Sequence, residues 1–100
     1  MRLTEPQRAI IKQTLLKHFG AASEVRLFGS RVDDNARGGD IDLYIEPEIQ
    51  RADDIVEAKL NALVELHRQL GEQKIDLVIN RKQGINLPIY QVAKETGVLL

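Results

Sequence analysis

The chain has 100 residues, of which 43% are hydrophobic and 29% are charged, and its formal net charge is −1. These values are typical of a globular protein, and the length predicts a single domain over residues 1–100. The balanced charge argues against a protein that grips a nucleic acid directly, and the absence of cysteine excludes disulfides and thiolate metal sites. No segment resembles a signal peptide or could span a bilayer, so we expect a cytoplasmic location.

The first predicted elements are a helix and a strand. The segment TEPQRAIIKQTLLKHFG, residues 4–20, begins with a capping-box pattern at Thr4 and Gln7 and ends at Gly20. Its apolar side chains Ile11, Leu15 and Phe19 recur at about one helical turn, which predicts a helix. The short segment EVRLFG, residues 24–29, is rich in strand-forming residues and ends at a glycine, which predicts a strand.

The next segments are a polar connection and a second strand. Residues 30–39, SRVDDNARGG, predict a short helix or turn followed by a loop. In DIDLYIE, residues 40–46, the side chains of Ile41, Leu43 and Ile45 alternate with polar ones, and Pro47 closes the segment. This alternation predicts a strand with one buried face.

The C-terminal half predicts a long helix, a third strand and a last helix. In residues 51–70 we expect the apolar face to follow Val56, Leu60, Leu63, His67 and Leu70. The segment KIDLVIN, residues 74–80, alternates like a strand. Residues 86–97, NLPIYQVAKETG, predict a short helix with Asn86 as its cap. This order predicts an α/β (α+β) fold, in which a small mixed sheet has helices packed on one face.

Three aspartates in the two later strands are candidate metal ligands. Asp40 and Asp42 share one face of a strand. Their Cα atoms are expected to lie about 6.6 Å apart, at about 3.3 Å of rise per residue. Asp76 interrupts the apolar segment KIDLVI, and a parallel crossover between the two strands would bring the three carboxylates together. A divalent cation relieves the repulsion within such a cluster. Oxygen ligands without histidine or cysteine favour Mg²⁺ or Mn²⁺.

The turn that follows the first strand is a candidate phosphate site. Backbone N–H groups at Gly29 and the hydroxyl of Ser30 can bind phosphate oxygens. Arg31 and Arg37 can neutralise further phosphate charge. A metal beside a phosphate-binding turn is the arrangement that a nucleoside triphosphate requires.

This pattern, FGS-R…GGDIDL followed by IDLVI, resembles the DNA polymerase β-like nucleotidyltransferase superfamily. The short chain is similar to its minimal nucleotidyltransferase branch, the MntA-like antitoxins, from about residue 10 to residue 97. The resemblance implies the palm-like fold of that superfamily and a site that holds two Mg²⁺ ions, or Mn²⁺. It also implies transfer of a nucleoside monophosphate, with ATP as the expected donor, to a hydroxyl of a partner protein. That partner is expected to be a HEPN-type RNase toxin, in a homo- or hetero-oligomer.

The resemblance also assigns a role to each residue of the motif. Gly29, Ser30 and Arg31 would bind the nucleotide. Asp40, Asp42 and Asp76 would bind the metals, and Asp76 would help to activate the attacking hydroxyl.

Simpler interpretations remain open for each of these features. Asp40 and Asp42 can belong to a polar turn at a strand start, Asp76 can face water on an edge strand, and Ser30 can cap a helix. Arginines in a polar loop are usually solvated. The whole chain can also be a catalytically inactive module that neutralises its partner by forming a complex with it.

Overall fold

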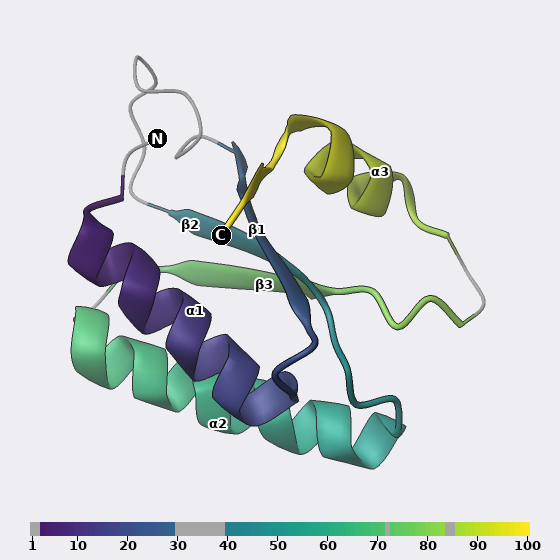
Figure 1. The fold of residues 1–100 in the computed structure, drawn as a ribbon, viewed down its shortest axis with the longest axis horizontal. Helices are drawn as coiled ribbons and strands as arrows, with labels where there is room; N and C mark the ends of the chain where they lie inside the picture. Colours follow the sequence, from purple (N-terminus) through teal and green to yellow (C-terminus); the bar gives the residue numbers. More distant parts are fainter. Residues whose placement is uncertain (1–2, 30–39, 72, 84–85) are drawn as a thin grey trace.

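The computed structural model describes residues 3–29, 40–71, 73–83 and 86–100 (Figure 1). The elements in chain order are α1 (Glu5–Phe19), β1 (Glu24–Phe28), β2 (Ile41–Glu46), α2 (Ala52–Leu70), β3 (Ile75–Ile79), α3 (Pro88–Thr96) and β4 (Val98–Leu99). The connection predicted over residues 30–39 lies outside the described residues. No helix within the described ranges is long and apolar enough to cross a membrane.

The strands form a mixed four-stranded sheet in the order β3-β2-β1-β4. β2 and β3 pair in parallel, and the helix α2 connects them, which confirms the predicted crossover. β1 pairs antiparallel with β2 on one side and with β4 on the other. The strand β4 was not predicted, because its two residues are too few to show an alternating pattern.

Two long helices, α1 and α2, cover one face of the sheet and enclose the main core (Figure 1). Ile41, Leu43 and Ile45 of β2 point into this core and are fully buried, as the alternation in DIDLYIE predicts. Ile75 and Leu77 of β3 join them. The predicted α/β (α+β) fold with a small mixed sheet is therefore confirmed.

The opposite face of the sheet is not bare, because the helix α3 packs on it. A second, smaller cluster forms there from Phe28, Tyr44 and Ala93, with Val78 and Tyr90 at its margin. Helices therefore lie on both faces, and the expectation of helices on one face holds only for α1 and α2. Tyr44 belongs to the face predicted to be polar, but it is fully buried in this cluster.

The helix α1 forms as its sequence predicts. The hydroxyl of Thr4 accepts from the backbone N–H of Gln7 at 3.2 Å, and the Gln7 side chain accepts from the N–H of Thr4 at 3.0 Å. This reciprocal cap satisfies backbone donors that a helix start leaves free. Ile11, Leu15 and Phe19 are fully buried in the main core.

The buried face of α2 agrees with the predicted one only in part: Leu63 and Leu70 pack against the core, but the other predicted residues are exposed. The side chains that enter the core are Ile55, Ala58, Ala62 and Leu66, whereas Val56 and Leu60 are exposed by 69% and 64%. The prediction followed the larger apolar residues and passed over the alanines. Small side chains let a helix lie close to its neighbours, so the alanine-bearing stripe makes the inner face.

The start of α3 also differs from the prediction. Leu87 occupies the N-cap position and its side chain makes no capping bond, so Asn86 is not the cap. Pro88 begins the helix, where its fixed φ and missing N–H are both tolerated.

Candidate active site

Asp42 and Asp76 lie opposite each other at the ends of two neighbouring strands. The parallel register of β2 and β3 pairs Asp42 with Asp76, and the antiparallel register of β1 and β2 pairs Phe28 with Asp42. The two side chains are close enough for the charge of Asp76 to raise the pKa of the Asp42 carboxyl. The sequence prediction that these two acids meet on one face of the sheet is therefore confirmed.

This arrangement makes the carboxyl of Asp42 harder to ionise. Burial raises its pKa above the ordinary value of 3.8, and the negative charges of Asp76 and Asp40 raise it further. Hydrogen bonding with Asp76 acts in the same direction, and among the described residues the charge of Lys74 opposes these effects. An acid held in this way binds a cation readily, because the cation removes the repulsion that disfavours its charged form.

Gly29 lies against Asp42 at the end of β1. Its φ is 76°, in the left-handed region that favours glycine. A Cβ at this position would overlap the Oδ2 atom of Asp42. Glycine is therefore required here twice, once by the backbone conformation and once by the close approach of the carboxylate.

Asp40 stands beside this pair, in contact with a lysine. Its Oδ2 lies 3.9 Å from the Nζ of Lys74, and both side chains are substantially exposed. Its charge is close enough to Asp42 to raise the pKa of that carboxyl. In the part of the chain that the structure describes, no three His, Cys, Asp or Glu side chains gather closely enough to hold a metal by themselves.

A cavity of about 550 Å³ opens next to Asp42 and Asp76. Its other walls come from all the surrounding elements: Phe28, Lys59, Leu63, Ile75, Leu77, Val78 and Ile89. Its volume falls within the range of about 300–1,000 Å³ that is common for ligand sites, although it is an open hollow. No sequence spacing pointed to Lys59, because it lies on a helix remote from the motif, and only the folded arrangement shows its position.

The remaining predicted nucleotide-binding residues, Ser30 and Arg31, lie outside the described residues, as does Arg37. Gly29, Asp40, Asp42 and Asp76 are therefore the predicted site residues that the structure places.

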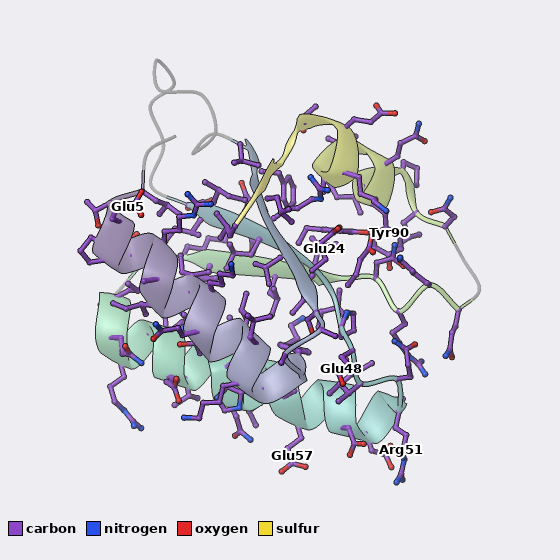
Figure 2. The ribbon with its side chains drawn as sticks, in the orientation of Figure 1. Glu5, Glu24, Glu48, Arg51, Glu57 and Tyr90 are labelled. Atoms are coloured by element: carbon purple, nitrogen blue, oxygen red, sulfur yellow. The ribbon has the colours of Figure 1, made fainter. Side chains whose placement is uncertain are left out.

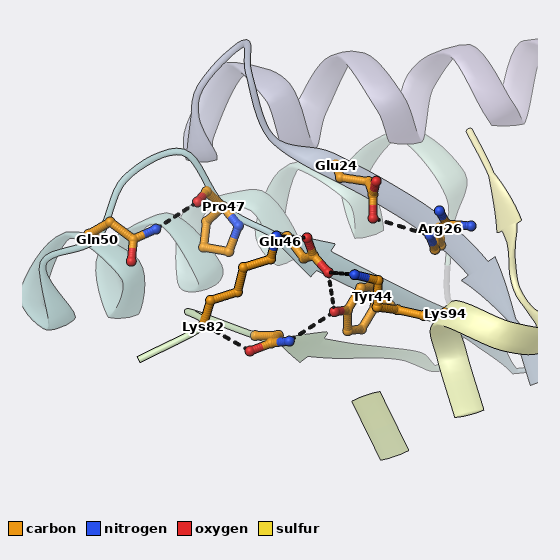
Figure 3. A network of polar contacts seen from close by, with 9 residues as sticks. Glu24, Arg26, Tyr44, Glu46, Pro47, Gln50, Lys82 and Lys94 are labelled. Atoms are coloured by element: carbon orange, nitrogen blue, oxygen red, sulfur yellow. Dashed lines mark hydrogen bonds and ion pairs between the residues drawn. The ribbon is translucent and has the colours of Figure 1, made fainter. Parts of the chain in front are cut away.

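A polar cluster that sequence reasoning missed lies at the other end of β2 (Figure 3). Glu46 is only 9% exposed, and its two oxygens bind Lys82 Nζ at 2.7 Å and Lys94 Nζ at 2.9 Å. The Tyr44 hydroxyl donates to Glu46 at 2.5 Å and accepts from the Asn80 amide at 3.0 Å. Because Lys94 belongs to α3 and Lys82 to the segment after β3, Glu46 ties both to the sheet.

The electrostatics of this cluster are the reverse of those at Asp42. Burial alone would raise the pKa of Glu46, but the hydrogen bonds from Lys82, Tyr44 and Lys94 outweigh it and lower the pKa to about 2. Burial and the bond to Glu46 raise the pKa of Tyr44 to about 12. A second hollow of about 550 Å³ lies beside these residues. Volume therefore does not single out a site, and the carboxylate pair makes the cavity at Asp42 the better candidate.

Comparison with known proteins adds no family to this description. No protein-family model matches the chain, and no curated protein matches it. The geometry of the site is therefore the basis for assigning a function.

The arrangement suits a hard divalent cation held jointly by protein and substrate. Asp42 and Asp76 offer oxygen ligands at one point, and Asp40 is close by. Mg²⁺ is commonly bound by one or two carboxylates together with water and substrate phosphates, without a cage made only of protein ligands. Two converging carboxylates beside a cavity satisfy that requirement.

Proposed function

We propose that this chain is a metal-dependent nucleotidyltransferase related to the DNA polymerase β-like superfamily. It would transfer a nucleoside monophosphate, AMP from ATP, to a hydroxyl of a partner protein. One observation carries the proposal: the parallel register of β2 and β3 sets Asp42 against Asp76, directly beside the glycine that ends β1. The resemblance of FGS-R…GGDIDL to that superfamily points to the same residues.

The carboxylates of Asp42 and Asp76, with Asp40, would hold magnesium. The metal would supply positive charge to the triphosphate, which the carboxylates alone would repel. In the transfer, the acceptor hydroxyl oxygen forms a bond to the α-phosphorus of ATP. The bond from that phosphorus to the bridging oxygen breaks, and pyrophosphate leaves with the electron pair. The carboxylate of Asp76, the more exposed of the two, takes the hydroxyl proton.

The walls of the cavity have separate tasks in this reaction. Phe28, Val78 and Ile89 are apolar and would keep water away from the α-phosphorus, which limits hydrolysis of ATP. Lys59 is the cation among the lining residues and would attract the phosphates.

The size of the chain suggests where the acceptor comes from. The described residues form one sheet with helices on its two faces, and they include no separate unit that could hold a large acceptor. The acceptor hydroxyl would therefore belong to another chain. We propose an antitoxin role, in which the partner is a HEPN-type RNase toxin that is inactivated by adenylylation.

The first test is binding of ATP with Mg²⁺, measured by isothermal titration calorimetry. We expect saturable binding that Asp42→Asn weakens at least about tenfold, because one cation ligand is lost. Asp54→Asn is the matched control, since it makes the same chemical change on an exposed turn of α2. Absence of binding at millimolar ATP, or equal binding by the Asp42 variant, would contradict the proposal.

The second test is transfer itself. ATP labelled on the α-phosphate is incubated with the chain and a HEPN-type RNase toxin as the candidate acceptor. Label should appear on that protein only with Mg²⁺ present and with Asp76 intact. With ATP labelled on the γ-phosphate, the label should stay in solution, because it leaves as part of pyrophosphate. Transfer of the γ-label to the protein would indicate a kinase.

A second candidate is an inactive module that binds its partner and occludes it. Exposed apolar side chains favour this candidate, since α2 and α3 both carry them: Val56, Leu60, Val64 and Val92. An Asp40→Asn/Asp42→Asn double variant distinguishes the two functions. If that variant still neutralises the partner as well as the unchanged chain, occlusion is the mechanism.

A further inference from the structure

The outer surface of α2 carries an apolar stripe that the fold does not use. Val56, Leu60 and Val64 are exposed by 69%, 64% and 49%. They follow one another at intervals of four residues, so they form a continuous line along the helix. A surface helix normally presents polar side chains to water, and an apolar outer line therefore indicates a contact surface.

This stripe lies on the side of α2 opposite the core. Successive residues of a helix are rotated by about 100°, since there are about 3.6 residues per turn. The buried residues Ala58 and Ala62 are therefore turned away from Leu60 by more than about 150°. The helix is apolar on two opposed sides, and the protein's own core occupies only one of them.

Charges of opposite sign flank the two ends of the stripe. Asp53 and Glu57 lie near its N-terminal end, and Arg68 lies near its C-terminal end, on the same edge by the same rotation. Figure 2 shows the carboxylate of Glu57 pointing away from the body of the molecule. Within the described residues, Asp53 pairs only with Arg51, at 3.7 Å and with both side chains largely exposed, and no ion pair involves Glu57 or Arg68.

We infer that the occupant of this stripe is a second copy of the same chain, packed with its α2 antiparallel. The two-fold axis passes at Leu60, so that Leu60 meets its counterpart and Val56 meets Val64 of the other copy. Because the sequence positions mirror each other about residue 60, Arg68 of one copy then lies opposite position 52 of the other, next to Asp53, with Glu57 about 7.5 Å further along at about 1.5 Å per residue. The surface is its own complement in both shape and charge, which a two-fold interface requires.

The contact is small, so the dimer is weak. The helix has 19 residues and is about 28 Å long, at about 1.5 Å of rise per residue. One helix pair buries less than about 1,200 Å², the range of transient complexes. We expect a monomer at about 1 µM and a substantial dimer fraction as the concentration approaches about 1 mM, the range of weak affinities. The inference does not depend on the proposed catalysis, since none of the acids at the candidate site is involved.

Sedimentation equilibrium over that concentration range tests the dimer. Leu60→Glu should leave the chain folded, because the side chain is already exposed, and should weaken association at least about tenfold by placing two like charges at the axis. Val92→Glu is the matched control: it adds the same charge at an exposed apolar site on α3, and it should not change association. A monomeric chain at every concentration, or equal association of the Leu60 variant, overturns the inference.

A charge reversal tests the antiparallel direction. Arg68→Glu should weaken the dimer several-fold, because it sets a like charge against Asp53 of the other copy. Adding Asp53→Arg to that variant should restore part of the loss. If the double variant associates no better than Arg68→Glu alone, the copies do not pair in this direction.

The absence of native cysteine allows a direct test of register. Leu60→Cys should form a disulfide-linked dimer on mild oxidation, since facing residues at a two-fold axis come within the reach of a disulfide. Val56→Cys alone should not, because its copies lie about 12 Å apart along the axis, at about 1.5 Å per residue. A mixture of Val56→Cys and Val64→Cys chains should cross-link. Cross-linking of Val56→Cys with itself, in preference to the mixture, would overturn the proposed register.

Discussion

Glu46 is the side chain whose replacement should most reduce stability among the charged residues described above. In the folded chain its pKa is about 2, against an ordinary value of 4.5. At about 1.4 kcal/mol per pKa unit, this difference corresponds to about 3 kcal/mol of folding free energy at neutral pH. Glu46→Gln removes the charge that Lys82 and Lys94 bind while it keeps the size of the side chain. We expect the variant to lose about 2–3 kcal/mol, or roughly 10–20 °C in Tm for a domain of this size.

The sign of the pH dependence follows from the lowered pKa. The folded state favours ionised Glu46, so the stabilisation is complete above pH 4.5 and is lost as the pH falls toward 2. Urea denaturation at a series of pH values measures the difference in free energy of unfolding between the unchanged chain and Glu46→Gln. This difference should narrow to about half near pH 3. Glu24→Gln is the control, because Glu24 pairs with Glu46 across the two strands but is more exposed, and among the described residues its ion pair is with Arg26. A gap that does not change with pH would refute the electrostatic reasoning.

Three further changes test the rest of the structure. Gly29→Ala should lower the free energy of unfolding by about 1–3 kcal/mol in chemical denaturation, since the positive φ and the nearby Asp42 carboxylate both oppose a Cβ. Asp42→Asn should stabilise the metal-free chain at pH 7, because the raised pKa of Asp42 means that its ionisation is disfavoured in the fold. The gain in free energy of unfolding should vanish below pH 3.8. A variant less stable than the unchanged chain at pH 7 would refute this expectation. Leu66→Ala should lower the free energy of unfolding by about 2–5 kcal/mol, because Leu66 is fully buried. Leu60→Ala at low protein concentration should change it by less than about 0.5 kcal/mol, because Leu60 is exposed. A larger effect at residue 60 than at residue 66 would contradict the observed buried face of α2.

Much of the fold is encoded in local patterns that can be recognised without a structure. The cap at Thr4, the alternation in DIDLYIE and the third strand with its lone Asp76 are all local signals, and the structure confirms each. The parallel pairing of β2 and β3 follows from a helix of sufficient length between them. The meeting of Asp42 and Asp76 therefore needed only local information and one topological rule.

The errors arose where the outcome depends on what packs against an element. The inner face of α2 runs through Ala58 and Ala62, and hydrophobicity alone ranks these below Val56 and Leu60. The burial of Tyr44 depends on α3, which arrives from a distant part of the chain. The same holds for Glu46, because the two lysines that bind it are residues 82 and 94, and no sequence pattern near residue 46 predicts these contacts.

The two ends of β2 have opposite effects on stability. This contrast supports a functional role for the end at Asp42. At Glu46 the surroundings favour the charged acid, through two lysines and a hydroxyl. At Asp42, four residues earlier, burial and two neighbouring acids disfavour it, and the adjoining Gly29 holds a backbone conformation that other residues resist. Stability alone would favour a neutral side chain at residue 42. Local arrangements that reduce stability tend to persist where they serve binding or catalysis. A cation bound between Asp42 and Asp76 would turn this unfavourable pair into a favourable one, which is why we place the chemistry at that end of the strand.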